Sequence, residues 1–250
     1  MKFAIALTIL LISRPAVAKD LLFLGQDFPP FNWAEAGVVK GAMVDVMKTA
    51  CEKLRHNCKF AIVPLARGLR MLEAGTADGV MTLIPNAERA VYANFSPAIA
   101  ATKLTYFGLK GKLNKADSLN DLEGWTVGAV RASTSLQIAI QNQKQLKAMN
   151  IIEESHNRQM ILKLQAGRYG EKGAIFGSEA VLEFEARKQQ VALEAILMDT
   201  NQGYANGFTT AFSKKSMDAK IVADFANTLE AMKKNGEVKL ILEKFDLKTK

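Results

Sequence analysis

The stretch LARGLRMLEAGTADGVMTLIPNAERAVYANFSP, which runs from Leu65 to Pro97, carries most of the information about the fold. Leu69 and Leu72 have the spacing of an amphipathic helix, and Gly75 predicts where that helix ends. The apolar run from Ala77 to Leu83 leaves no room for a helix, so we predict a buried parallel strand there.

The turn after this strand is where we expect a ligand. In an open α/β sheet, ligands bind beyond the carboxyl ends of the strands. Thr82 lies at the end of the predicted strand, Asn86 lies in the turn, and Arg89 lies in a short predicted helix. A second short extended segment, Phe95 to Pro97, follows that helix.

Outward from this stretch, the chain alternates between strand and helix patterns. Its 250 residues are enough for two lobes of roughly 100 residues each. Strands are predicted at Leu21 to Leu24, Phe60 to Val63, Leu104 to Leu109, Thr126 to Val130, Ala174 to Phe176, Ile196 to Met198 and Gly207 to Phe212; helices are predicted up to Leu54, at Leu136 to Met149, 156 to 167, Ala180 to Gln189 and from Ser213 to the end, with a break at Gly236.

The first 18 residues have the pattern of a secretory signal peptide. Lys2 gives a positive start, Phe3 to Ile12 is apolar, and Ala16-Val17-Ala18 is a small-x-small cleavage site. A membrane anchor is the alternative, but the apolar run is too short to cross a bilayer. We therefore expect an exported, periplasmic protein. Its net charge of +8 comes from scattered residues, which argues against a nucleic-acid partner.

Three short motifs in the opening stretch resemble one protein family. Gly75-Thr76-Ala77-Asp78-Gly79, Glu88-Arg89 and Phe95-Ser96-Pro97 look like the first lobe of the bacterial extracellular solute-binding proteins of family 3. These are periplasmic receptors of polar amino-acid ABC transporters. The closing segments Ala211 to Lys215 and Met232 to Phe245 are similar to the family's last pattern, so the resemblance covers nearly the whole mature chain.

The resemblance implies an α/β fold of the two-lobed type II periplasmic binding proteins. Each lobe would be a mixed sheet flanked by helices, with two hinge crossings near Ala101–Leu104 and Gln202–Ala205. Residues 1–18 would be the signal peptide, 19–103 and 205–250 lobe 1, and 104–204 an inserted lobe 2. The expected partners are a small-molecule ligand and an inner-membrane ABC permease, and the protein is expected to be a monomer.

The two cysteines, Cys51 and Cys58, are expected to form a disulfide because an exported chain meets an oxidising compartment. Two buried free thiols are the alternative. A metal site is a weaker interpretation, because only His56 lies nearby, and no cofactor is expected. The spacing also resembles the disulfide of the lysine/arginine/ornithine- and histidine-binding receptors, which joins the first helix to the second strand.

In lobe 1, the resemblance assigns ligand contacts to three residues, and the position of Arg67 at a predicted helix start makes it a fourth candidate. Phe28 matches an aromatic that stacks on the ligand, although it could instead fill the core as we expect for Phe31. Arg89 matches the arginine that holds the ligand carboxylate, with a salt bridge as the alternative. Thr82 matches the first of two hydroxyl residues before that arginine. Arg67 would contact the ligand or form a salt bridge within lobe 1.

In lobe 2, Arg131, Ser133 and Thr134 open a predicted helix, where they could cap it or bind an anion. Ser178 stands where the family has an aspartate for the α-ammonium group, and Glu179 follows it. The polar turn with Tyr204 completes the candidate ligand set: Phe28, Arg67, Thr82, Arg89, Arg131, Ser133, Thr134, Ser178, Glu179 and Tyr204. Three arginines with few acids indicate an anion rather than a standard amino acid.

Three functions compete at this stage. The leading hypothesis is a receptor that closes on a small solute by a hinge. The second is an enzyme on the same scaffold, because periplasmic dehydratases resemble these receptors and Glu179 could act as the acid. No Ser–His–Asp or metal constellation is visible, and we expect no catalytic residue. The third is a sensory ligand-binding protein.

Overall fold

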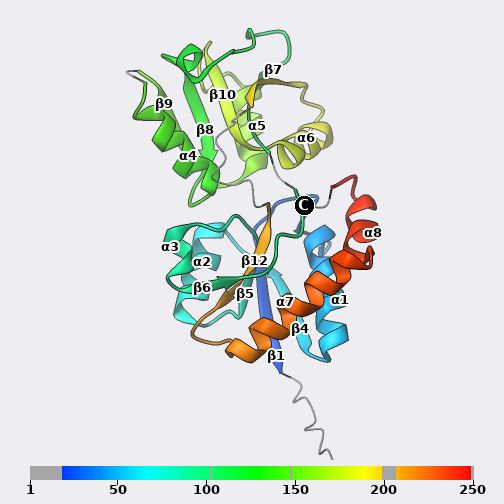
Figure 1. Ribbon diagram of the computed structural model, residues 1–250. Helices are drawn as coiled ribbons and strands as arrows, with labels where there is room; N and C mark the ends of the chain where they lie inside the picture. The colour runs from blue at the N-terminus through cyan, green and yellow to red at the C-terminus, as the bar shows by residue number, and fades with distance from the viewer. Residues whose placement is uncertain (1–18, 102, 147, 199–206, 249–250) are drawn as a thin grey trace, which may run out of the picture.

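The computed structural model describes residues 19–101, 103–146, 148–198 and 207–248, which form two lobes (Figure 1). Each lobe contains one five-stranded mixed sheet with helices on both faces, and a two-stranded hairpin accompanies the first sheet. This is the α/β, two-lobed fold of the type II periplasmic binding proteins that the sequence predicted.

The first sheet has the strand order β4-β1-β5-β12-β6. Its strands β4, β1 and β5 are parallel, and β12 is antiparallel to both of its neighbours. All five residues of β5 are buried, as predicted for the apolar run, and β5 is parallel to β1 but antiparallel to β12. The strands are β1 (Asp20–Gly25), β4 (Asn57–Ile62), β5 (Gly79–Leu83), β6 (Ala93–Phe95) and β12 (Thr209–Ser213).

Alternate residues of these strands face two separate layers of helices, since successive side chains of a strand point to opposite faces. Leu24, Val80 and Ala211 pack under α2 (Leu65–Ala74), with α3 (Ala87–Ala90) on the same side. Phe23 and Phe212 pack on the other side, where their rings lie 5.7 and 5.3 Å from the ring of Phe225. That side is covered by α1 (Ala42–Leu54), α7 (Ala219–Lys234) and α8 (Glu237–Glu243).

The predicted helix ends are confirmed at two glycines. Gly75 follows the last residue of α2 with φ +77°, and Gly236 separates α7 from α8 with φ +86°. Both values lie in the left-handed region, which glycine adopts without the steric cost that a Cβ atom imposes.

The second sheet has the order β11-β7-β10-β8-β9, with β9, β8 and β10 parallel and the other two strands antiparallel to their neighbours. On one face α4 covers the stacked rings of Tyr106 and Phe176, whose centroids are 4.0 Å apart. On the other face α5 and α6 cover Phe107 and Ile175. The elements are β7 (Leu104–Leu109), the 3-10 helix η1 (Leu119–Leu122), β8 (Thr126–Val130), α4 (Thr134–Gln143), β9 (Asn150–Glu154), α5 (Asn157–Gln165), β10 (Gly173–Ser178), α6 (Glu179–Lys188) and β11 (Leu193–Met198).

Several features differ from the sequence expectation, among them the helix predicted from Ser213, which begins at Ala219. The helix predicted to reach Met149 ends at Gln143, and the unpredicted strand β9 begins at Asn150. The Asn150 N–H donates to the Trp125 carbonyl at 2.8 Å, which sets β9 beside β8. The residues after Gln143 contain no local stop signal, so the end of this helix could not be predicted from the sequence. The hairpin β2 (Trp33–Glu35) and β3 (Val38–Lys40) was also not predicted.

The chain passes between the two sheets twice. It leaves the first sheet after β6 and enters the second at β7, and it returns between β11 and β12. Beside the first passage, Ala100 pairs with Phe208 in an isolated antiparallel bridge. The predicted second crossing, Gln202–Ala205, lies outside the described residues, as does the predicted signal peptide. The residue bounds of the lobes remain a prediction.

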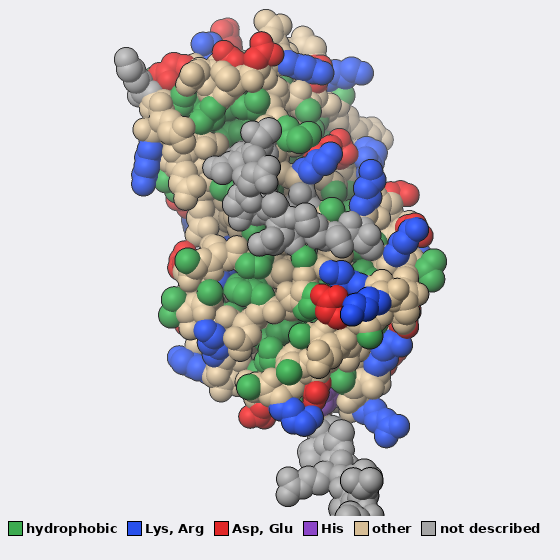
Figure 2. Space-filling view, in the orientation of Figure 1, with side chains coloured by type: hydrophobic (Ala, Val, Ile, Leu, Met, Phe, Trp, Pro, Cys, Tyr) green, Lys and Arg blue, Asp and Glu red, His purple; other side chains and the backbone are tan. Residues whose placement is uncertain are grey.

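The surface of the described part carries no basic stripe on the face that Figure 2 shows, where Lys and Arg are spread over both lobes. Among the described residues, no helix combines the length and the apolar character that crossing a bilayer requires.

A disulfide joins Cys51 of α1 to Cys58 of β4, with 6.2 Å between the Cα atoms. The bond closes a short loop, so its loss should lower the free energy of unfolding by about 2–3 kcal/mol in the chain-entropy model. We expect reduction of the exported protein to lower its melting temperature by ~2–4 °C for each kcal/mol lost. Thiol labelling under denaturing, non-reducing conditions should find no free thiol, and two labelled cysteines would contradict the prediction.

Candidate functional site

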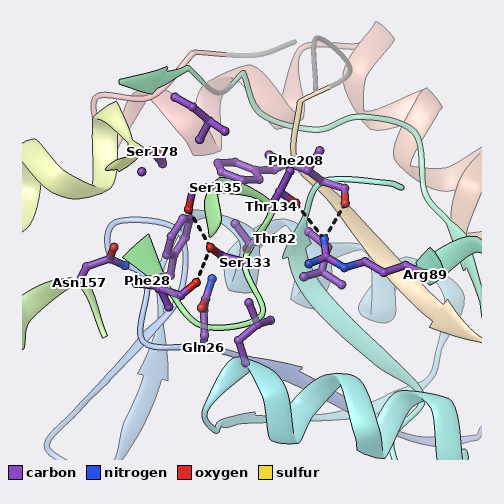
Figure 3. A pocket seen from close by; sticks show the side chains of 16 residues that line it. Gln26, Phe28, Thr82, Arg89, Ser133, Thr134, Ser135, Asn157, Ser178 and Phe208 are labelled. Carbon is purple, nitrogen blue, oxygen red and sulfur yellow. Dashed lines mark hydrogen bonds between the residues drawn. The ribbon is translucent and has the colours of Figure 1, made fainter. Parts of the chain in front are cut away.

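A small cavity lies between the two lobes, at the carboxyl ends of strands from both sheets (Figure 3). Its volume is about 40 Å³, room for a few water molecules but not for an amino acid. The lobes therefore stand close together in this structure. The polar residues that line the cavity are Gln26, Thr82, Arg89, Ser133, Thr134, Ser135, Asn157 and Ser178; the apolar ones include Phe28, Leu65, Ile84, Leu104, Val130 and Phe208.

Arg89 is the cation of this cavity, and its side chain bridges the two lobes. One terminal nitrogen donates to the Ile84 carbonyl at 2.8 Å and to the Thr134 hydroxyl at 3.2 Å. The other donates to the Ala132 carbonyl at 3.0 Å. The residue is only 2% exposed, and burial lowers the pKa of Arg89 more than the charges of Tyr92 and Glu88 raise it.

No carboxylate forms an ion pair with Arg89 within the described part of the chain. The salt bridge that was the alternative to ligand binding is therefore absent there. A buried charge without an opposite charge is costly, and the neutral carbonyls compensate it only in part. An anion entering this cavity would supply the missing charge.

Backbone strain flanks Arg89 on both sides. Thr82 has φ +59° in lobe 1, and Ala132 has φ +60° in lobe 2. Positive φ is uncommon for any residue with a Cβ and is an outlier for a β-branched threonine. The Thr82 hydroxyl donates to the buried Asn32 side chain, which holds this conformation. Strain of about 1–3 kcal/mol per residue often concentrates at ligand sites, because surrounding contacts must maintain it.

The amino end of α4 lies beside Arg89. The Ser133 hydroxyl accepts from the Leu136 N–H at 3.0 Å, so Ser133 caps the helix, which is one of the two roles that the sequence allowed. Thr134 and Ser135 nevertheless face the cavity, and the first N–H groups of any helix have no partner inside it. With the helix dipole, this end carries partial positive charge and can also bind an anion.

Phe28 and Phe31 both belong to the hydrophobic core, but only Phe28 also lines the cavity. Phe28 lines the cavity and packs against Phe208, with 5.6 Å between the ring centroids. Phe31 is fully buried behind it and belongs to the core.

Several predicted site residues lie elsewhere. Arg67 is exposed to solvent. Arg131 is also largely exposed, and it forms an ion pair with Glu153 at 3.0 Å. Neither arginine therefore points between the lobes. Glu179 lines a different cavity with Lys103 and Lys248. Of the three arginines that were predicted to line the site, only Arg89 lines this cavity. Tyr204 lies outside the described residues.

Sequence reasoning missed Gln26, Ser135, Asn157 and Phe208, which all line the cavity. Asn157 follows the unpredicted strand β9, so without that strand its position at a sheet edge could not be inferred. Gln26 directly follows β1 and could have been found by the same rule that singled out the turn before Arg89. Among the described residues, no cluster of three or more His, Cys, Asp or Glu could hold a metal ion.

A second set of contacts joins the lobes at the rim of the cavity. The Gln137 side chain of α4 accepts from the Asn86 amide at 2.9 Å and donates to Glu88 at 3.0 Å. Neither Gln137 nor its two partners lines the cavity. These two hydrogen bonds therefore favour the closed arrangement without touching the space where a ligand would lie.

Gln137→Ala should shift the protein toward an open arrangement. Each lost hydrogen bond contributes about 0.5–1.5 kcal/mol, so the open fraction should rise several-fold. Small-angle X-ray scattering of the unliganded protein measures this as a larger radius of gyration. Gln141→Ala, at an exposed position on the same helix, is the matched control. Identical scattering from both variants would show that the rim contacts do not hold the lobes.

Comparison with known proteins gives one family and many similar structures. The sequence model of the bacterial extracellular solute-binding proteins, family 3, matches residues 22–248. No curated protein matches the sequence significantly.

Among solved structures, three illustrate the range of similar proteins. A substrate-binding protein of an amino acid ABC transporter has a TM-score of 0.77 and 20% identity, covering 90% of this chain and 98% of its own. A histidine kinase sensor domain has a TM-score of 0.81 and 17% identity, with coverage of 92% and 98%. An ancestral amino acid-binding protein, a precursor of cyclohexadienyl dehydratase, has a TM-score of 0.76 and 21% identity, with coverage of 90% and 94%. At these identities the likeness establishes the fold.

Proposed function

The chain belongs to family 3 of the bacterial extracellular solute-binding proteins, and from this premise we propose that it is a periplasmic receptor of an ABC transporter. Its ligand is a small polar or anionic solute, an amino acid or a related carboxylate, which it captures between the two lobes. The observation that carries this proposal is Arg89, a buried cation that faces the cavity between the lobes without a carboxylate partner.

The ligand carboxylate would take over the bonds that Arg89 now makes to lobe 2. A carboxylate accepts two parallel N–H bonds from a guanidinium, which are stronger than bonds to neutral carbonyls. The Thr134 hydroxyl and the amino end of α4 would complete the anion site, while Phe28 would form an apolar wall. Because the cavity is now too small for such a ligand, the lobes must separate to admit it and close again around it.

The enzyme and sensor hypotheses gain no support from a particular residue. Glu179, the acid considered for a dehydratase-like reaction, lies in another cavity beside Lys103 and Lys248. The similar sensor domain and the similar dehydratase precursor share the fold, which many functions can use.

Native mass spectrometry of protein purified from the periplasm tests the proposal. We expect a mass increase from a co-purified small polar or anionic solute, which is released on denaturation and recovered unchanged after incubation. Recovery of a chemically altered solute would favour the enzyme, and failure of any small polar solute or carboxylate to bind the stripped protein would refute the receptor.

A further inference from the structure

We propose that the solute is a carboxylate whose second polar group is uncharged, a 2-hydroxy or 2-oxo acid, and not an α-amino acid. The inference rests on the proposed function and narrows it. It comes from the end of the cavity opposite Arg89, where Figure 3 shows Asn157 and Ser178 on the far side of Phe28, with Gln26 next to Phe28.

The side chains of Ser178 and Asn157 at that end are neutral and make no hydrogen bond to another described residue. Ser178 is 4% exposed and its hydroxyl makes no hydrogen bond within the described structure. Asn157 is 5% exposed, and no other described residue bonds its side-chain amide. Buried polar groups are normally hydrogen-bonded, so the Ser178 hydroxyl and the Asn157 amide are free to bond a ligand that enters the cavity. A hydroxyl and an amide can each donate and accept, which suits a neutral hydroxyl or carbonyl.

Of the described residues that line this cavity, none carries a carboxylate. Asp27 lies in an adjoining cavity of about 360 Å³, where it faces His156 and Arg158. Burial raises the pKa of Asp27, while the charges of His156, Lys188 and Arg158 act against that rise. Asp27 thus lies outside this cavity and interacts with cations of its own, although burial has the larger effect on its pKa. Glu179 follows Ser178 directly but lies in another cavity, beside Lys103 and Lys248.

An ammonium group at this end would lose its hydration without gaining an opposite charge, and it would lie in the same small cavity as the Arg89 cation. Burying an unpaired charge costs far more than burying a hydroxyl that forms hydrogen bonds. The same end accepts a hydroxyl at little cost, because Asn157 and Ser178 can each form a hydrogen bond with it. The cavity therefore binds a negative charge at the Arg89 end and disfavours a positive charge at the end with Asn157 and Ser178.

The test uses pairs of probes that differ only in that group: lactate and alanine, malate and aspartate, phenyllactate and phenylalanine. Calorimetric titration of the stripped wild-type protein should show the hydroxy acid of the best-bound pair binding at least tenfold more tightly than its amino acid. Ser178→Asp should reverse that preference, because its carboxylate would lie beside the ammonium group of a bound amino acid. Asn157→Asp makes the same change with an isosteric side chain, in case Ser178→Asp does not fold. Gln141→Glu adds the same charge on the exposed face of α4 and should change nothing.

The outcomes separate the two proposals. Wild-type protein that binds the amino acid as tightly as, or more tightly than, the hydroxy acid overturns this inference and leaves the receptor intact. The same holds if neither acidic variant shifts the preference. Failure of every carboxylate and every other small polar solute to bind the stripped wild-type protein overturns the receptor proposal itself and this inference with it.

Discussion

Arg89→Ala is expected to weaken binding of the co-purified solute about 30-fold or more while the protein stays folded. Truncating one partner of a buried, charged hydrogen-bonded pair costs roughly 2–5 kcal/mol, and each 1.4 kcal/mol is a factor of ten in affinity. Arg89 is the only cation that lines the cavity among the described residues, so no neighbour can replace its charge. Calorimetric titration measures the loss, and melting curves control for folding.

Two variants separate ligand binding from lobe closure, because Arg89 also bonds to Ala132 and Thr134 of the other lobe. Gln137→Ala removes rim contacts but keeps the cation, so it should weaken binding far less than Arg89→Ala. Arg89→Lys keeps the charge but cannot form two parallel bonds, so it should recover little affinity. Unchanged affinity in folded Arg89→Ala protein would end the anion-binding hypothesis.

Glu154→Ala should destabilise lobe 2 by about 2–4 kcal/mol, since it removes the charge at the centre of a buried network. The Glu154 carboxylate is 2% exposed and accepts from Lys163 at 2.7 and 3.0 Å and from the Tyr169 hydroxyl at 2.8 Å. Truncation leaves the Tyr169 hydroxyl buried without its acceptor. Lys163 is partly exposed and can turn to water, which keeps the estimate below that for a fully buried ion pair.

The adjacent residue provides the control for this prediction. Glu153 forms an ion pair with Arg131 in which both side chains are about half exposed or more, so Glu153→Ala should change stability by less than about 1 kcal/mol. Glu154→Gln should be intermediate, because an amide oxygen can still accept from Tyr169. Thermal melting of the three variants measures these changes in stability. Equal melting temperatures for Glu153→Ala and Glu154→Ala would show that the Glu154 network does not stabilise the fold.

The elements that could be predicted from the sequence are those with a local signal. The helix before Gly75, the apolar strand after it and the short helix with Arg89 all follow from spacing, length and a glycine. Strand β9 could not be predicted, because its residues Asn150–Glu154 follow a polar segment without a stop signal and become a strand only by pairing with β8.

The cavity lining could be predicted where a residue lies near the carboxyl end of a strand, as Thr82 does in β5 and Arg89 does in the short helix after it. It could not be predicted where the direction of a side chain decides. Ser178 and Glu179 are neighbours, yet one faces the cavity between the lobes and the other faces a cavity beside Lys103. Arg131 and Thr134 begin the same turn, yet Arg131 reaches outward to Glu153. Such choices depend on contacts between segments far apart in the chain.

The strand order also has a consequence for the sequence of folding events. Strand β12 lies between β5 and β6, so the first sheet cannot be completed before residues 209–213 are available, more than 120 residues after β5. All strands of the second sheet lie between residues 104 and 198, a continuous segment. Pairing of distant segments requires a large loss of chain entropy before contacts compensate it, which slows folding. As the chain is synthesised from its amino end, the inserted lobe can therefore complete its sheet while the sheet of the lobe that carries Arg89 still lacks β12.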